Sequence, residues 1–315
     1  MKVSVKVPAT TANIGPGFDC LGMALPIYNT LTIEETVLPG TGIEINVIAE
    51  SSNIDDLSLE HIPLDENSIV YKAIELLYNS IGQTPSELKI NIKSNIPVAR
   101  GLGSSASVIV GALVAANELL GKPADEFALL SLACELEGHP DNITPALVGG
   151  LVISSQEDDG SVIYRRLDWP SEWMVTVCVP DFELSTDIAR SVLPKDVPMK
   201  DAVYNAQRLG MFIQAVHTKD KELMKIALND RLHQPYRIKL IQGLDKIMAN
   251  LRHIDSVLGC VISGAGSSIL VISEKNDLDK IKNIVKDTWA DQNIKCDIKT
   301  LNVEQTGAQI VSDDD

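Results

Sequence analysis

Aromatic residues are scarce in this sequence: Phe, Tyr and Trp together make up 4% of its 315 residues. Hydrophobic residues as a whole still account for 45%. A sizeable core must therefore be built from Val, Ile, Leu and Ala, as is usual where helices pack on sheets. The length suits either one large domain or two modest ones.

Paired cysteines and long apolar segments are also missing. The five cysteines are an odd number and none forms a C-x-x-C pair, so neither a zinc site nor a disulfide framework is expected. No apolar run approaches the length of a membrane span, and the first ten residues contain no apolar signal core. We therefore expect a soluble, cytoplasmic protein with reduced thiols and no membrane partner.

Positive charge is in deficit, because 27 Lys and Arg residues face 43 Asp and Glu residues, a formal net charge of -16. Such a chain has no general attraction for nucleic acid or anionic lipid, and no nucleic-acid partner is expected. A nucleotide would need a local site made of backbone N–H groups, a few Arg or Lys side chains and a metal ion. The simpler interpretation of the negative charge is solubility.

Hydrophobic periodicity divides the chain into predicted elements. Alternating or β-branched runs predict strands at 2–7, 25–34, 42–48, 88–94, 148–154, 172–179, 260–262, 269–272 and 297–301. Helical spacing predicts helices at 67–80, 104–120, 125–137, 186–193, 199–217, 222–228, 240–253 and 277–289. The pattern indicates an α+β protein of two lobes, residues 1–160 and 161–315.

Residues 97–107, PVARGLGSSAS, follow a predicted strand and open a predicted helix. Glycines permit positive φ and close backbone approach, and a helix N-terminus attracts anions. The loop is neither a Walker A sequence nor a full dinucleotide fingerprint. From spacing alone, a Gly-rich turn with a Ser cap is the alternative interpretation. Small residues in the following helix would let it pack close to the sheet and aim its N-terminus into the centre of the molecule.

The string P-x-x-x-G-L-G-S-S-A within this loop closely resembles the phosphate-loop signature of the GHMP kinase superfamily. The resemblance implies a two-lobed fold, with an N-terminal lobe like domain 2 of ribosomal protein S5 and a ferredoxin-like C-terminal lobe. It also implies ATP and Mg²⁺ as cofactors. The ATP-binding residues that it implies are Asn67, Pro97, Val98, Ala99, Arg100, Gly101, Leu102, Gly103, Ser104, Ser105, Ala106 and Ser107.

Residues 8–22, PATTANIGPGFDCLG, contain the end of a predicted strand and the rigid Gly/Pro turn that it enters. The turn would bring Asn13 near Asp19, whose carboxylate could, with the Asn amide, hold a substrate ammonium and hydroxyl. The alternative is that Asn13 and Asp19 only stabilise the turn and bind no ligand, since both residue types are favoured in turns. The string resembles the homoserine kinase family within the superfamily, in which the equivalent Asn and Asp contact the amino acid.

Three further segments resemble the same family, 138–145, 185–190 and 233–237, and a fourth, 263–268, resembles the third motif of the GHMP superfamily. The last of these is a Gly-rich turn that lies against the phosphate loop in the family. Two Arg side chains that converge on one carboxylate are sound chemistry, although each alone could be a surface ion-pair residue. The substrate-binding residues implied are Asn13, Asp19, His139, Asn142, Thr186, Arg190, Arg237 and Gly264.

One loop Ser and one helix Glu hold Mg²⁺ in the superfamily. Ser105 matches the Ser, and Glu135 is the better match for the Glu. Glu137 remains the competing choice. Residues two apart on a helix face different sides, so we expect only one of the two to face the site. We expect Asn142 to orient the substrate, whereas Asp141 is structural or assists without acting as a dedicated strong base.

The resemblance implies transfer of phosphate from ATP to the hydroxyl of L-homoserine, which gives O-phospho-L-homoserine on the route to threonine. Members of the family are often dimeric, so a homodimer is possible. Two alternatives stay open. One is another GHMP kinase, such as a mevalonate kinase, and the other is a nucleotide-binding or regulatory protein that has lost catalysis.

Overall fold

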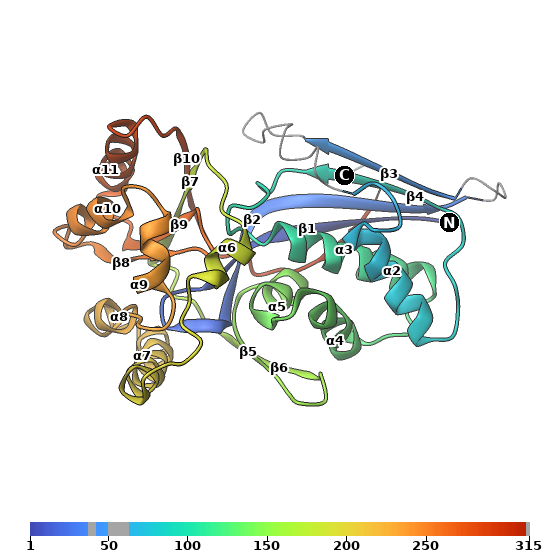
Figure 1. Ribbon diagram of the computed structural model, residues 1–315, viewed down its shortest axis with the longest axis horizontal. Coiled ribbons are helices and arrows are strands. Elements are labelled where there is room, and N and C mark those ends of the chain that lie inside the picture. Colours follow the sequence, from blue (N-terminus) through green and yellow to red (C-terminus); the bar gives the residue numbers. More distant parts are fainter. Residues whose placement is uncertain (37–41, 50–62, 313–315) are drawn as a thin grey trace.

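The structure is a computed structural model that describes residues 1–36, 42–49 and 63–312. Two lobes lie side by side, and each is built on its own sheet (Figure 1). Among the described residues, no helix combines the length and apolar character that crossing a membrane requires. The two-lobed α+β architecture confirms the predicted fold class.

The first sheet has the order β11-β1-β2-β4-β3, and the β5–β6 hairpin pairs with β2. Its pairs are antiparallel except for β3 and β4, which run parallel. Strand β2 is long enough to pair with β4 along one half and with β5 near its start. The strands are β1 (Lys2–Asn13), β2 (Gly17–Glu35), β3 (Ile43–Ala49), β4 (Leu88–Ser94), β5 (Leu151–Gln156), β6 (Val162–Leu167) and β11 (Gln309–Val311).

Within the described residues, one face of this sheet is covered by the helices α2 (Ile69–Ser80), α3 (Ser104–Leu119), α4 (Glu126–Glu137) and α5 (Pro140–Val148). Helix α3 packs on β1 and β2 because its sheet-facing residues are small. A Cβ at Gly111 would lie 3.2 Å from Val7 Cγ2 and 3.4 Å from Leu31 Cβ. The close packing expected for this helix is therefore confirmed.

The second sheet has the order β10-β7-β9-β8, with every neighbouring pair antiparallel. With its helices it forms the β-α-β-β-α-β arrangement of a ferredoxin-like lobe. The strands are β7 (Trp173–Pro180), β8 (Val257–Ile262), β9 (Ile269–Glu274) and β10 (Cys296–Leu301). The helices are α6 (Thr186–Ser191), α7 (Met199–Thr218), α8 (Lys221–Ala227), α9 (Gln234–Arg237), the 3-10 turn η1 (Ile238–Leu240), α10 (Leu244–Leu251) and α11 (Leu278–Ala290).

Alternating residues of β9 separate two apolar cores in this half of the molecule. Val271 faces the core that contains Trp289 of α11. Leu270 faces the other core, which contains Phe212 of α7 and also Leu21 from the first sheet. The lobes are therefore joined by a shared hydrophobic core, which fixes the position of the cleft between them.

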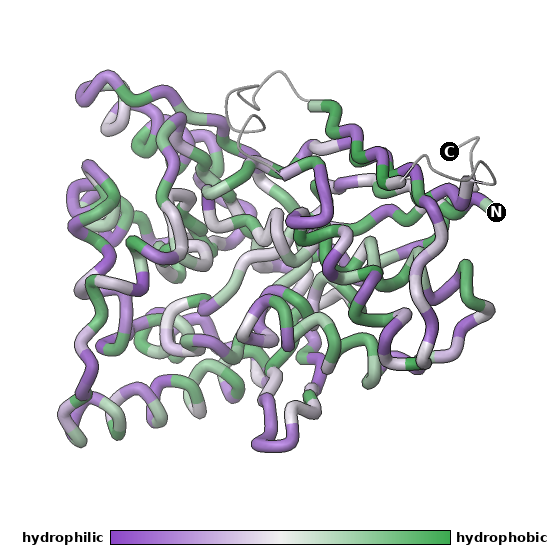
Figure 2. The backbone as a smooth tube through the Cα atoms, turned by 45° about the vertical axis from the view of Figure 1, so that its right-hand side comes forward, coloured by the Kyte–Doolittle hydropathy of each residue, from purple (hydrophilic) through white to green (hydrophobic). Residues whose placement is uncertain are grey.

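Sheet pairing corrects the predicted domain boundary at 160/161, which falls inside the β5–β6 hairpin. Strand β6 pairs with β5, and β11 returns from the far end of the chain to pair with β1. Both strands thus belong to the first sheet. Figure 2 shows the hydrophilic tip of the hairpin, residues 157–160, at the bottom of the molecule. That polar turn marks a hairpin within one lobe and not a linker between lobes.

Candidate active site

A cleft of about 150 Å³ lies between the lobes and is lined from both sides. The first lobe contributes the end of β1, the loop 97–105 and the α4–α5 junction, and the second contributes α6, α9 and the β8–β9 turn. The cleft contains all eight predicted substrate-binding residues. The residues that line the cleft and that the sequence analysis had singled out as functional are Asn13, Asp19, Pro97, Val98, Ala99, Arg100, Gly101, Leu102, Gly103, Ser104, Ser105, His139, Asp141, Asn142, Thr186, Arg190, Arg237 and Gly264.

The loop 97–107 places the start of α3 at the cleft. Gly103 precedes the helix with φ 65° and ψ 33°, in the left-handed region that glycine adopts without strain. The first bond of the helical ladder joins Ser107 N to Gly103 O at 2.9 Å. The N–H groups of Ser104, Ser105 and Ala106 precede that ladder and are oriented to bind an anion.

Three other segments fix the backbone of this loop. Thr10 N donates to Leu102 O at 3.1 Å, and Leu184 N donates to Ala99 O at 2.9 Å. The hydroxyl of Ser263 donates to Gly101 O at 2.7 Å. The contact expected between the turn at 263–268 and the loop is therefore present, and both lobes hold the loop in place.

Two polar side chains of the loop stabilise it through hydrogen bonds to neighbouring backbone and side-chain groups. The Arg100 guanidinium is buried and donates to Val98 O at 2.9 Å and to Pro180 O at 3.3 Å. The Ser107 hydroxyl donates to Ser104 O at 2.7 Å and accepts from Asn29 Nδ2 at 2.9 Å. Neither Ala106 nor Ser107 lines the cleft. The side chains of Ala106 and Ser107 are buried under the helix start, so only the backbone of these two residues is left to contact ATP.

Of the two candidate metal ligands, the competing choice Glu137 fits the cleft better than Glu135. Glu135 is exposed, whereas the Glu137 carboxylate lines the cleft and accepts a hydrogen bond from Ser105 Oγ at 2.8 Å. The two residues face different sides of α4, as their spacing requires. Burial raises the pKa of Glu137, although the Ser105 hydrogen bond opposes that effect. A partly buried carboxylate beside a hydroxyl is a fitting pair of hard oxygen ligands for Mg²⁺.

Asp141 and Asn142 lie at the start of α5, a helix that the sequence pattern did not predict. Asp141 is 1% exposed, and its Oδ1 lies 2.7 Å from His139 Nδ1. Burial acts to lower the pKa of His139, but the hydrogen bond and charge of Asp141 raise it overall. Asn142 Oδ1 accepts a hydrogen bond from Thr10 Oγ1 at 2.8 Å, which fixes the amide beside the loop.

Asn13 and Asp19 lie close together, as predicted. Asn13 Oδ1 accepts from Asp19 N at 3.0 Å, and Asn13 Nδ2 donates to Gly264 O at 2.8 Å. The two oxygens of Asp19 receive a forked pair of bonds from Arg190, at 2.8 and 3.1 Å. Arg190 and Asp19 were each expected to bind substrate, and the structure shows in addition that they bind one another.

A second guanidinium, that of Arg237, reaches the cleft from α9 and is 1% exposed. It donates to Ala189 O at 3.0 Å and to Gly264 O at 3.1 Å. The ring of Phe18, which the sequence did not single out, has the Arg190 and Arg237 guanidiniums 5.6 and 5.3 Å from its centroid. Burial, and then the charge of Arg190, lower the pKa of Arg237. Cation–π contacts thus help two like charges to converge where a carboxylate can bind.

Asn67 is the predicted residue that the structure places farthest from expectation. Its backbone N–H and its side-chain amide both bond to Asp65, at 2.9 and 3.3 Å, and the side chain is exposed. This local turn directs the amide to solvent before α2 begins. Asn67 does not line the cleft.

Comparison with known proteins identifies the family to which this chain belongs. Residues 68–150 match the GHMP kinases N terminal domain, and residues 212–291 match the GHMP kinases C terminal domain. The chain is 39% identical to a homoserine kinase of Crocosphaera subtropica over 308 residues, which covers 98% of this chain and 97% of that protein. The chain belongs to the homoserine kinase family. A relative in that family from Caldicellulosiruptor saccharolyticus is 42% identical over 312 residues, with 98% and 97% coverage.

A solved structure supports the same family at the level of the fold. The crystal structure of homoserine kinase from Cytophaga hutchinsonii superposes with a TM-score of 0.87 at 28% identity, and the match covers 98% of this chain and 97% of that one. The similarity to these homoserine kinases therefore spans both lobes and the cleft between them. It is not confined to the phosphate loop.

Proposed function

We propose that this chain transfers the γ-phosphoryl group of ATP to the side-chain hydroxyl of L-homoserine, which produces O-phospho-L-homoserine and ADP. The observation that carries the proposal is a single cleft in which an anion-binding helix start faces Asp19, Arg190 and Arg237. Relatives about 40% identical over nearly the whole chain have the name homoserine kinase. In the family the product leads to threonine.

The phosphate side of the cleft works mainly through backbone. The N–H groups of Ser104, Ser105 and Ala106 would bind phosphate oxygens at the positive end of α3. Because the loop is fixed by β1 and by the β8–β9 turn, little reorganisation is needed when charge develops on the transferred group.

Ser105 and Glu137 would hold Mg²⁺. Among the described residues no three His, Cys, Asp or Glu side chains gather to form a metal site. The protein would then supply two oxygen ligands, and phosphate oxygens and water the others, as is common for this ion. When bound, Mg²⁺ neutralises negative charge on the phosphates during transfer.

The substrate side suits a zwitterion. The ion pair between Asp19 and Arg190 offers both signs of charge at one place, and Arg237 adds a second cation. The carboxylate of homoserine would bind the guanidiniums, and its ammonium would bind Asp19 with help from Asn13 Oδ1. A substrate without an amine would offer no cation to Asp19, whose charge would then be balanced by Arg190 alone.

The phosphoryl transfer proposed here relies on positioning and on charge, without a dedicated strong base. Asn142, held by Thr10 beside Gly103, would orient the hydroxyl for in-line attack. Asp141 is bound to His139 and would position that ring. The proton would leave with the transferred phosphate.

The test is a coupled ADP-release assay with ATP, Mg²⁺ and either L-homoserine or mevalonate, with phosphorus NMR to identify the product. We expect turnover and a phosphomonoester with homoserine only. Turnover with mevalonate alone would favour the other GHMP activity, and no turnover with homoserine would reject the proposal. Tight ATP binding without any phosphorylated alcohol would favour a regulatory protein.

The homodimer and the cytoplasmic location remain predictions, the first from the resemblance and the second from composition. Sedimentation velocity of the purified chain tests the first, and fractionation of the source cells tests the second.

A further inference from the structure

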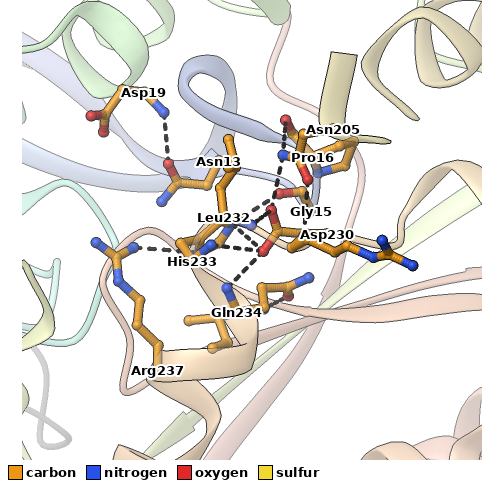
Figure 3. A network of polar contacts seen from close by, with 12 residues as sticks. Asn13, Gly15, Pro16, Asp19, Asn205, Asp230, Leu232, His233, Gln234 and Arg237 are labelled. Atoms are coloured by element: carbon orange, nitrogen blue, oxygen red, sulfur yellow. Dashed lines mark hydrogen bonds and ion pairs between the residues drawn. The ribbon is translucent and has the colours of Figure 1, made fainter. Parts of the chain in front are cut away.

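A network of polar contacts behind the substrate side of the cleft connects Asn13, Asp19 and Arg237 to side chains that the function proposed above does not use (Figure 3). Its centre is Asp230, whose side chain is completely buried. Oδ1 of Asp230 accepts from Leu232 N at 2.9 Å and from Asn205 Nδ2 at 3.0 Å. Oδ2 accepts from His233 N at 3.0 Å and from Gln234 N at 2.7 Å.

Four hydrogen bonds to one buried carboxylate are more than a helix start needs. Asp220, which is exposed, caps α8 with a single bond of 2.9 Å to Leu223 N. Burying a carboxylate is unfavourable unless its oxygens are fully satisfied. The Asp230 arrangement therefore indicates a requirement to hold residues 232–234 in one position.

His233 connects that position to two parts of the cleft. Its Nε2 lies 2.8 Å from Gly15 O, and its Nδ1 lies 3.5 Å from Arg237 Nη1. A carbonyl only accepts and a guanidinium only donates, so the proton of the neutral ring is on Nε2. Burial lowers the pKa of His233, in keeping with a neutral ring. The ring thus joins the turn after β1 to the substrate-binding Arg237.

Asn205 of α7 completes the connection. Its Nδ2 donates to Pro16 O at 3.2 Å as well as to Asp230, and its Oδ1 accepts from Arg231 N at 2.9 Å. Two adjacent carbonyls, those of Gly15 and Pro16, are therefore held by side chains of the second lobe. The same turn positions Asn13 and Asp19 on the first lobe, and Figure 3 shows them on the same side of the network as Arg237.

We propose that Asp230 is a positioning residue for amino-acid binding: it fixes His233 and Arg237 against the turn at residues 13–19, so that the groups for both ends of the substrate keep one spacing. This inference rests on the function proposed above. Asp230 would act through His233 and Asn205 and would not touch the substrate. Its loss should weaken binding of the amino acid and leave the ATP side of the cleft intact.

The first experiment compares Asp230→Asn with the wild type and with Asp220→Asn as a matched control at another helix start. Asp230→Asn should raise the KM for homoserine about tenfold, while the KM for ATP changes less than about twofold. Asp220→Asn should leave both KM values unchanged. A folded Asp230→Asn variant that raises both KM values equally, or neither, would overturn the proposal, because a purely structural role predicts no selectivity.

The second experiment keeps the proposal testable if Asp230→Asn does not fold. Gln at position 233 retains an N–H donor for Gly15 O, whereas Leu removes it. His233→Gln should stay within about twofold of the wild-type KM for homoserine, and His233→Leu should raise it about fivefold. Equal KM values in the two variants would contradict the proposal. Wild-type turnover of homoserine tests the proposed function separately, so the two failures are distinguishable.

Discussion

The two sides of the cleft are built in different ways. The phosphate side is one continuous loop, 97–105, that offers mainly backbone N–H groups from the start of α3. The substrate side is assembled from side chains of distant segments: Asp19 and Arg190 are 171 residues apart, and Asn13 and Gly264 are 251 residues apart. In the proposed function, local backbone would bind the phosphates of ATP, and distant side chains would bind the amino acid.

This difference predicts how each side fails. A backbone loop tolerates no added atoms where other backbone approaches it, so its glycines should be the most sensitive positions. A side-chain site loses one charge at a time, so its variants should affect one substrate more than the other. The predictions below test that contrast, from the largest expected effect to the smallest.

Gly101→Ala should have the largest effect. A Cβ there would lie 2.1 Å from Ser263 O, at a backbone φ of +71°. Backbone strain and the clash should together lower the free energy of unfolding by about 3 kcal/mol. Displacement of the loop should lower kcat/KM by about 1,000-fold. Urea unfolding and steady-state kinetics measure the two effects.

Gly121→Ala is the matched control for this variant. Gly121 has a similar φ of +76°, but nothing lies within 4 Å of its added Cβ. It should lose about 1 kcal/mol of stability and no activity. If the two variants had equal kcat/KM values, close approach of the β8–β9 turn would not be what fixes the loop.

Glu137→Gln and Glu135→Gln test the metal side of the loop. Glu137→Gln should lower kcat/KM about 100-fold and raise the Mg²⁺ concentration needed for half-maximal rate, because it would remove an ionised oxygen from the proposed Mg²⁺ ligands. Glu135→Gln, on the exposed face of α4, should behave as the wild type. The reverse result would restore Glu135 as the ligand.

The pKa of Glu137 gives this test a second readout. Burial raises that pKa, so the ionised carboxylate is less favourable in the folded state than in the unfolded one. Its contribution to stability falls as pH rises through the folded-state pKa. Without Mg²⁺ at pH 7, Glu137→Gln should therefore melt at or above the wild-type temperature, even though its activity is lost.

The contrast also explains how much could be predicted from the sequence. The loop, the strand 88–94 and helix α3 are contiguous patterns, and each was predicted almost to the residue. The choice between Glu135 and Glu137 could not be predicted in this way, because the rotation of α4 about its axis depends on what the helix packs against. Resemblance to family motifs assigned the predicted substrate-binding residues to one site, but periodicity alone could not place Asp19 beside Arg190.

Other features lay beyond local patterns. Helix α5 begins with Pro140 and contains Pro145, so its sequence resembles a loop, although proline is favourable at a helix start. Strand β11 is three residues long and forms only because β1 offers a free edge. Phe18 and Asp230 have roles that come from tertiary contacts with residues far away in the sequence.

Arg237→Met tests the selectivity of the side-chain site. Met keeps much of the length of Arg without its charge, so the KM for homoserine should rise about 50-fold, while the KM for ATP stays within about twofold. The variant and the wild type should be inhibited equally by 3-aminopropan-1-ol, which has the amine and hydroxyl of homoserine without its carboxylate. Arg252→Met, on an exposed residue, is the control. A parallel rise in both KM values would place Arg237 on the phosphate side instead.

Asp141→Asn should have the smallest effect on turnover. Asn keeps an oxygen that can accept the hydrogen bond from His139 Nδ1, so kcat should fall less than about tenfold if Asp141 positions that ring and is not a base. Loss of the Asp141 charge leaves burial as the main influence on His139, so the pKa of His139 should fall, which NMR titration of the ring measures. Asp159→Asn, in the exposed β5–β6 turn, is a control that should change neither value. A loss of kcat of about 10,000-fold would instead identify Asp141 as the base that takes the hydroxyl proton, since that is the upper range for a positioned base.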